Sequence, residues 1–168
     1  MCLRDSYNTR REECLAAADA LGAESLREVT PDHLEVAHGS IDEVLYRRAA
    51  HIVGENDRVW KAVHAMEVGD AVTIGTLMNA SHESSRINFE NSTAELDELV
   101  AIAQSLPGVL GSRLTGGGFG GGTVTLTTAD EAPRIAEELR NRYAERHDHA
   151  PATFVCRIAD GAAVLWRS

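Results

Sequence analysis

Apolar residues recur at spacings of three and four through most of the first two thirds of the chain, which is the period of amphipathic helices. A first helix is predicted over residues 5–22, with Gly22 as its stop. A long helix is predicted to open at the capping signal of residues 40–43 and to end near Gly69, and another covers residues 70–82. Further helix starts are expected at Ser25, Thr30, Ser92 and Thr128.

The later part of the chain has the pattern of strands. A glycine turn separates two short apolar runs, and the second run, residues 123–128, is β-branched and alternating, so a β-hairpin is predicted. After a helix that runs through Tyr143, strands are expected over residues 153–158 and 162–166. This order predicts an α+β fold in which a ferredoxin-like antiparallel sheet carries helices on one face, with additional amino-terminal helices. Residues 1–168 are expected to form a single domain.

Six of the seven residues from 116 to 122 are glycine. Each glycine loses much conformational freedom on folding, so this run indicates that something approaches the backbone closely. Bare N–H groups would suit a phosphate. A Walker-type loop is excluded because the only lysine, Lys61, lies far away in sequence, and the G-x-G-x-x-G match at Gly116, Gly118 and Gly121 is followed by a strand instead of a helix. A structural hairpin that binds no ligand is the alternative.

Three short blocks of sequence follow one another in order and are spread along nearly the whole chain. Residues 5–14 read DSYNTRREEC, residues 77–82 and 94–97 read LMNASH and AELD, and residues 107–124 read PGVLGSRLTGGGFGGGTV. The last block resembles the third conserved motif of galactokinases, which are members of the GHMP small-molecule kinase family. The first block resembles that family's segment around its sugar-contacting tyrosine, and the middle block resembles the region between the two.

The resemblance implies transfer of the γ-phosphoryl group of ATP to the anomeric hydroxyl of galactose. It implies that Tyr7 hydrogen-bonds a sugar hydroxyl, whereas the residue pattern alone also allows Tyr7 to be a core anchor. It places a glycine motif beside the phosphates, made of Gly116, Gly117, Gly118, Phe119, Gly120, Gly121 and Gly122. No catalytic base can be assigned, and ATP and magnesium are expected only with a further domain.

The resemblance is confined to the carboxy-terminal half of such an enzyme. The family's amino-terminal domain carries a sugar-binding stretch, a phosphate loop and the catalytic aspartate with its arginine partner, and none of these has a counterpart in residues 1–168. We therefore expect the isolated chain to be inactive unless an amino-terminal domain is supplied in trans. The alternative is a non-catalytic module that senses sugar or binds a protein. An uncovered apolar face would also favour homo-oligomers.

Charge and composition narrow the range of partners. The formal net charge of −10 argues against a nucleic-acid partner, since such proteins need clustered Lys and Arg. The arginines Arg10, Arg11, Arg47, Arg48, Arg140, Arg142 and Arg146 are scattered among glutamates and are expected to be solvated or ion-paired at the surface. The seven histidines show no metal-binding spacing, so no metal site is predicted.

The expected location is the cytoplasm, without membrane contact. No apolar run approaches the length that spans a bilayer, and Arg4, Asp5 and Arg10 occupy the region where a signal peptide would need an apolar core. The three cysteines form no C-x-x-C motif and are expected to be reduced thiols.

Overall fold

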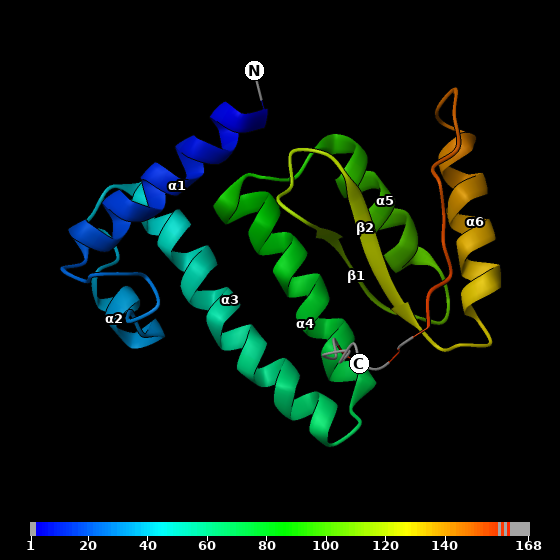
Figure 1. Cartoon of the computed structure of the whole chain (residues 1–168), viewed down its shortest axis with the longest axis horizontal. Coiled ribbons are helices and arrows are strands. Elements are labelled where there is room, and N and C mark those ends of the chain that lie inside the picture. The colour runs from blue at the N-terminus through cyan, green and yellow to red at the C-terminus, as the bar shows by residue number, and fades with distance from the viewer. Residues whose placement is uncertain (1–2, 158, 160, 162–168) are drawn as a thin grey trace, which may run out of the picture.

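The computed structural model describes residues 3–157, 159 and 161, and these form six α-helices, one π-helix and a two-stranded sheet. Helices α1, α2 and α3 lie at one side of the molecule, the sheet with α5 and α6 lies at the other, and α4 runs between them (Figure 1). The elements in chain order are α1 (Leu3–Ala20), α2 (Pro31–Val36), α3 (Glu43–Glu67), α4 (Ala71–Ser84), η1 (Ser85–Phe89), α5 (Ala94–Ser105), β1 (Val109–Thr115), β2 (Gly122–Thr127) and α6 (Ala132–Ala144).

Local sequence signals explain most helix ends. After α1, Gly22 has φ of 66° and donates to the Asp19 carbonyl, while Ala23 donates to the Ala18 carbonyl, which is a Schellman ending. The Thr30 hydroxyl accepts the His33 N–H at the start of α2, as its sequence predicts. The start predicted at Ser25 was wrong, because the chain makes only a turn there.

The long helix begins two residues later than its capping signal suggested. Asp42, and not Ser40, is the N-cap of α3, since its carboxylate accepts the N–H groups of Val44 and Leu45. The negative charge of this carboxylate lies at the amino terminus of the helix, where the helix dipole stabilises it further. The helix ends before Gly69, whose φ of 72° does not fit a continuing helix.

The predicted hairpin is confirmed and the α+β class with it. Strands β1 and β2 pair antiparallel, with Ser112 opposite Thr125 and Leu114 opposite Thr123. The strand expected over residues 153–158 was wrong for its described part, because residues 153–157 form no regular strand. The strand expected over residues 162–166 lies outside the described residues.

Helix α4 packs directly against β1 and supports the base of the hairpin. Gly75 and Gly111 permit backbone contact, because a Cβ on Gly75 would lie 2.2 Å from the Leu110 carbonyl oxygen. Two α4 side chains then accept strand N–H groups: Asn79 Oδ1 takes that of Ser112 at 2.8 Å, and His82 Nδ1 takes that of Leu114 at 3.3 Å. Side chains of α4 thus accept hydrogen bonds from backbone N–H groups of β1, which would otherwise be without a partner.

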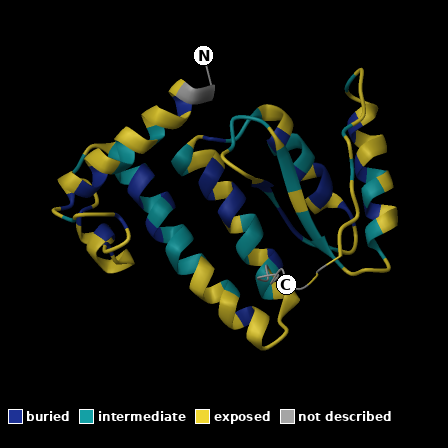
Figure 2. Ribbon diagram, in the orientation of Figure 1, coloured by how far each residue is buried: buried dark blue, intermediate teal, exposed yellow. Residues whose placement is uncertain are grey.

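Two apolar cores flank α4, and Figure 2 shows their buried residues on both sides of it. The first joins α1, α2 and α3 and consists of Ala17, Ala18, Leu21, Leu26, Val29, Leu34, Ala37, Ala49 and Val53. The second lies between α5 and α6 and consists of Ile102, Ala103, Leu106, Ile135, Leu139 and Tyr143. The buried residues of α4 itself are small or polar, namely Gly75, Ser81, His82 and Ser84.

Candidate functional site

The glycine-rich loop joins β1 to β2 and has an unusual backbone. Positive φ angles occur at Gly116, Gly118, Gly120 and Gly121, and also at Phe119, whose φ is 58°. A left-handed conformation at a large aromatic residue is uncommon and indicates that its surroundings hold it there.

Asn91 supplies those surroundings. The Phe119 N–H donates to the Asn91 carbonyl oxygen at 2.6 Å, and Asn91 Nδ2 donates to the Gly117 carbonyl oxygen at 3.2 Å. Gly118 lies so close to Asn91 that a Cβ there would be 2.2 Å from the Asn91 carbonyl oxygen. The close approach predicted for the glycine run therefore exists at Gly118, and its partner is this chain's own backbone.

The other glycines of the loop are not explained by such packing. A Cβ at Gly116, Gly117, Gly120, Gly121 or Gly122 would meet no atom of the described structure within 4 Å. Gly117 and Gly122 also have no positive φ, so neither packing nor conformation requires glycine at these two positions. The described chain leaves free space beside the backbone at both positions.

Asn91 is itself placed by a charged neighbour. Glu90 ends the π-helix η1 in a left-handed conformation, with φ of 52°. Its carboxylate accepts from Arg47 Nη1 at 2.8 Å and from Arg48 Nη2 at 2.6 Å. These hydrogen bonds from Arg47 and Arg48 lower the pKa of Glu90 to about 2. The carboxylate therefore stays ionised and bound at neutral pH.

Arg48 is the centre of the charged cluster. Its side chain is only 2% exposed, so the expectation of a surface residue was wrong for Arg48. Besides Glu90, Arg48 donates to Glu13 Oε2 at 2.6 Å and to the Asn88 carbonyl oxygen at 2.6 Å. Arg10 joins the cluster by donating to Glu13 at 2.5 Å. We call Arg10, Glu13, Arg47, Arg48 and Glu90 the Arg48 cluster.

The environment of Glu13 shows which effect dominates in this cluster. Burial alone would raise the pKa of Glu13, but the hydrogen bonds from Arg48 and Arg10 outweigh it, so the pKa lies below its ordinary value. A buried guanidinium is tolerated only when its N–H groups have partners, and Arg48 finds them in Glu13, Asn88 and Glu90.

Tyr7 lies near the amino-terminal end of α1 with 61% of its surface exposed. A role as a core anchor does not agree with that exposure, whereas a phenol open to solvent is able to meet a ligand. The described contacts join its helix to the glycine loop indirectly, through Arg10 and Glu13 to Arg48 and Glu90. Nothing in the spacing of Glu13, Arg48 and Glu90 along the chain indicated this cluster, because Glu13 and Glu90 lie 35 and 42 residues from Arg48.

Two buried histidines have structural partners. His82 Nε2 faces Asp97 at 3.3 Å while its Nδ1 accepts from β1, and burial lowers its pKa, which favours this neutral form. His51 stacks on Phe89 of η1 with ring centroids 4.4 Å apart and bonds to Ser84, and burial lowers its pKa to about 4. Within the described residues, no group of three or more His, Cys, Asp or Glu side chains could hold a metal ion.

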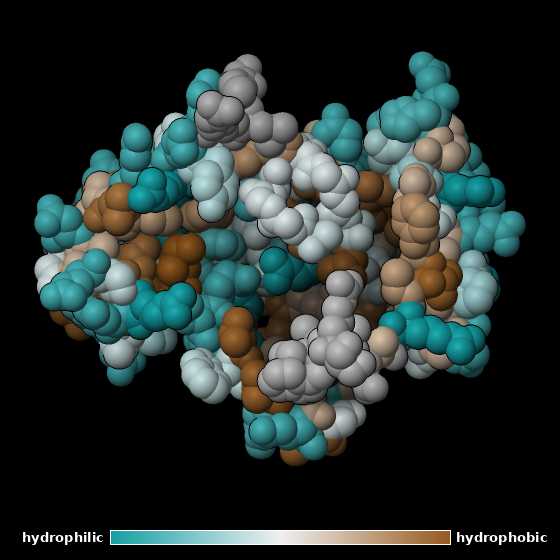
Figure 3. Space-filling view, viewed as in Figure 1, coloured by the Kyte–Doolittle hydropathy of each residue, from teal (hydrophilic) through white to brown (hydrophobic). Residues whose placement is uncertain are grey.

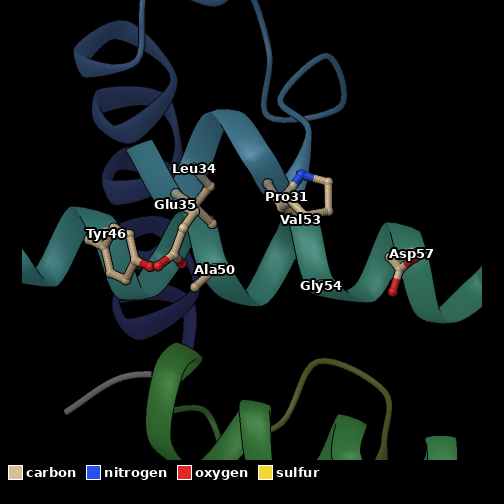
Figure 4. Close-up of a pocket in the computed structure, with 8 residues that line it drawn as sticks. All are labelled: Pro31, Leu34, Glu35, Tyr46, Ala50, Val53, Gly54 and Asp57. Carbon is tan, nitrogen blue, oxygen red and sulfur yellow. The ribbon is translucent and has the colours of Figure 1, made fainter. Parts of the chain in front are cut away.

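A separate pocket lies between α2 and α3 and contains none of the predicted site residues (Figure 4). Its volume is about 240 Å³ and it is lined by Pro31, Leu34, Glu35, Tyr46, Ala50, Val53, Gly54 and Asp57. Tyr46 and Glu35 point toward one another, and burial and the charges of Glu35 and Glu43 raise the pKa of Tyr46.

Across the described residues, no helix is both long enough and apolar enough to cross a membrane.

Comparison with known proteins adds to this geometry. Residues 62–145 match the family model described as GHMP kinases C terminal. The chain is 48% identical over 160 residues to the galactokinase of Bos taurus and 47% identical over 160 residues to that of Homo sapiens, in each case covering 95% of this chain and 40% of the relative. The galactokinase of Roseiflexus is 42% identical over 161 residues.

A solved structure shows the same arrangement. The crystal structure of Lactococcus lactis galactokinase complexed with galactose matches with a TM-score of 0.88 and 32% identity, covering 96% of this chain and 43% of that one. The chain therefore spans about two fifths of the length of these relatives.

Proposed function

The chain belongs to the GHMP kinase family and corresponds to its carboxy-terminal domain, and from that premise we propose that it is the carboxy-terminal half of a galactokinase-type enzyme. The complete enzyme would transfer the γ-phosphoryl group of MgATP to the anomeric hydroxyl of galactose. The solved relative was crystallised with galactose, which supports this choice of sugar.

In this proposal each half supplies different groups. This chain offers the exposed phenol of Tyr7 to a sugar hydroxyl and the glycine loop to the phosphates. An amino-terminal domain supplies the catalytic base and most of the phosphate site, and magnesium enters with ATP. Because phosphoryl transfer depends on positioning and on offsetting charge, half of the site is not sufficient, and the isolated chain is inactive.

The observation that carries the proposal is the open backbone of the glycine loop. Asn91 fixes the loop at Gly118, while at Gly117 and Gly122 nothing in the described chain accounts for glycine. Glycine at such positions lets a ligand or a second domain approach backbone N–H groups, which can offset the charge of phosphates. This matters in a protein whose formal net charge is −10, because its own surface otherwise repels ATP.

Exposed apolar side chains favour a protein partner. They gather on the second half of α3 and the start of α4, and Figure 3 shows hydrophobic atoms at the surface over the lower part of α3. Those that are more than two fifths exposed are Val59, Trp60, Val63, Met66, Val68 and Val72. A surface of this kind would be covered by an amino-terminal domain in cis or in trans, or by a second copy of the chain.

A chimera tests the proposal. In bovine galactokinase, the matching 40% is replaced by this chain, and ADP release with MgATP and galactose is measured for the chimera and for the chain alone. We expect turnover by the chimera and none by the chain. The variant Tyr7→Phe should raise the KM for galactose about tenfold, the cost of one hydrogen bond to a polar partner.

Tyr46→Phe is the matched control, because Tyr46 lies in the separate pocket between α2 and α3 and should leave the KM for galactose unchanged. Turnover by the chain alone that Tyr7→Phe reduces would contradict the assignment of the catalytic groups to another domain. A folded chimera without galactose-dependent ADP release would contradict the proposed activity.

A further inference from the structure

We infer that the Arg48 cluster is a positioning device that couples the helix of Tyr7 to the glycine loop, so that the sugar side and the phosphate side of the site are held in one arrangement. The names of these two sides rest on the proposed function. The coupling itself rests on contacts within the chain.

The first step is the attachment of α1. Arg10 follows Tyr7 by three residues and so lies next to it along the helix surface. Its guanidinium bonds to Glu13 at 2.5 Å and lies 3.8 Å from Glu90 Oε2, although the two glutamates belong to different segments. The orientation of the helix face that carries Tyr7 is therefore tied to the position of Glu90.

The second step is the buried guanidinium of Arg48. Its three hydrogen-bond partners are Glu13 in α1, the Asn88 carbonyl in η1 and Glu90 beyond η1. If one partner moved away, a charged group that is 2% exposed would lose a hydrogen bond that water could not readily replace. All three segments thus keep their places together.

The third step joins the cluster to the loop. The π-helix η1 is an uncommon element that often accompanies functional sites, and here it presents the carbonyls of Asn88 and Ile87 to Arg48 and Arg47. Glu90 is followed at once by Asn91, which binds the loop at Gly117 and Phe119. A displacement of Glu90 must therefore displace the residue that positions the loop.

A change in α1 that keeps the size of the side chain but removes its negative charge is the sharpest test, because Glu13 makes no hydrogen bond to the loop. Amide hydrogen exchange of the full chain is measured by NMR for Glu13→Gln. We expect the Phe119 amide to exchange about tenfold faster, the change produced by weakening one charge-assisted hydrogen bond, while the amides of α6 keep their rates.

The matched control is Glu138→Gln. Glu138 also binds two arginines, Arg134 and Arg142, but all three lie in α6 at the surface. In Glu138→Gln, the Phe119 amide should exchange at the same rate as in the unaltered chain. A reciprocal variant, Glu90→Gln, should accelerate exchange of the amides of residues 10–14 in α1, and it serves as the deciding variant if Glu13→Gln does not fold.

Two results would overturn the inference. One is an unchanged Phe119 amide in a folded variant, and the other is the same acceleration at every amide, which would indicate a loss of global stability without local coupling. Neither readout requires sugar or nucleotide. Failure of the chimera to phosphorylate galactose would therefore reject the proposed function and leave the coupling to be decided by exchange.

Discussion

Two arginines of this chain have the same kinds of hydrogen-bond partner, but one is buried and the other is exposed. Arg48 binds two glutamates, Glu13 and Glu90, and the Asn88 carbonyl. Arg134 likewise binds two glutamates, Glu131 and Glu138, and the carbonyl of Pro107. The Arg48 side chain is 2% exposed, whereas that of Arg134 is 41% exposed.

The difference lies in where the partners come from. Glu131 and Glu138 are three and four residues from Arg134, so they are its neighbours along one short stretch of the chain. The carboxylates that bind Arg48 are 35 and 42 residues away. The number of ion pairs around an arginine therefore says little about its role, and the separation and burial of its partners say much more.

The largest expected effect comes from removing each arginine. Arg48→Met should lower the free energy of unfolding by about 3 kcal/mol, at the low end of the range for a broken buried pair because Glu13 and Glu90 reach solvent. Arg134→Met should lower it by less than about 1 kcal/mol. Urea denaturation of both variants measures the difference, and equal losses would show that burial is not what distinguishes the two clusters.

A second comparison concerns two glycines of the loop. Gly118→Ala should lower the free energy of unfolding by about 2 kcal/mol or more, because φ is 79° and the new Cβ would collide with the Asn91 carbonyl. Gly117→Ala meets no atom within 4 Å and should change the stability by less than about 0.5 kcal/mol. Thermal unfolding of the two variants checks both values.

The same pair separates stability from function. In the chimera, Gly117→Ala should raise the KM for ATP although it hardly changes the stability, because a new methyl group would stand beside backbone that the described chain leaves uncovered. An unchanged KM for ATP would favour a purely structural hairpin.

The contrast between local and distant partners also explains which features of the structure the sequence predicted and which it missed. The Thr30 cap of α2, the glycine hairpin and the stop after α1 are local signals, and the structure confirms them. Arg48 carries no such signal, because a lone arginine on a helix looks like surface until residues from α1 and η1 fold against it. The family resemblance pointed to Tyr7 and the glycine loop, but it gave no sign of the cluster between them.

The strand over residues 153–157 failed for a related reason. Its β-branched and aromatic residues have the right composition, but a strand needs a partner, and Phe154 in the described structure is 84% exposed. Propensity for the β conformation mainly reflects packing on a sheet, so without that contact it does not decide the conformation.

The smallest expected effect is a dependence on pH that belongs to the buried cluster. The pKa of Glu90 falls from its ordinary 4.5 to about 2 because Arg47 and Arg48 donate to it. A carboxylate with a lowered pKa stabilises the fold fully above its unfolded pKa, and that contribution disappears as the pH falls from 4.5 through about 2. The Glu90 side chain is 41% exposed, so solvent reduces the effect.

The stability of the unaltered chain and of Glu90→Gln should therefore converge as the pH falls over this window. Urea titrations at pH 5, 4 and 3 would measure the convergence. Each comparison is between two proteins at one pH, so the protonation of other carboxylates largely cancels. A constant difference between the two proteins across these pH values would mean that the ionised form of Glu90 gains nothing from the arginines, and that geometry alone holds Asn91 and the loop in place.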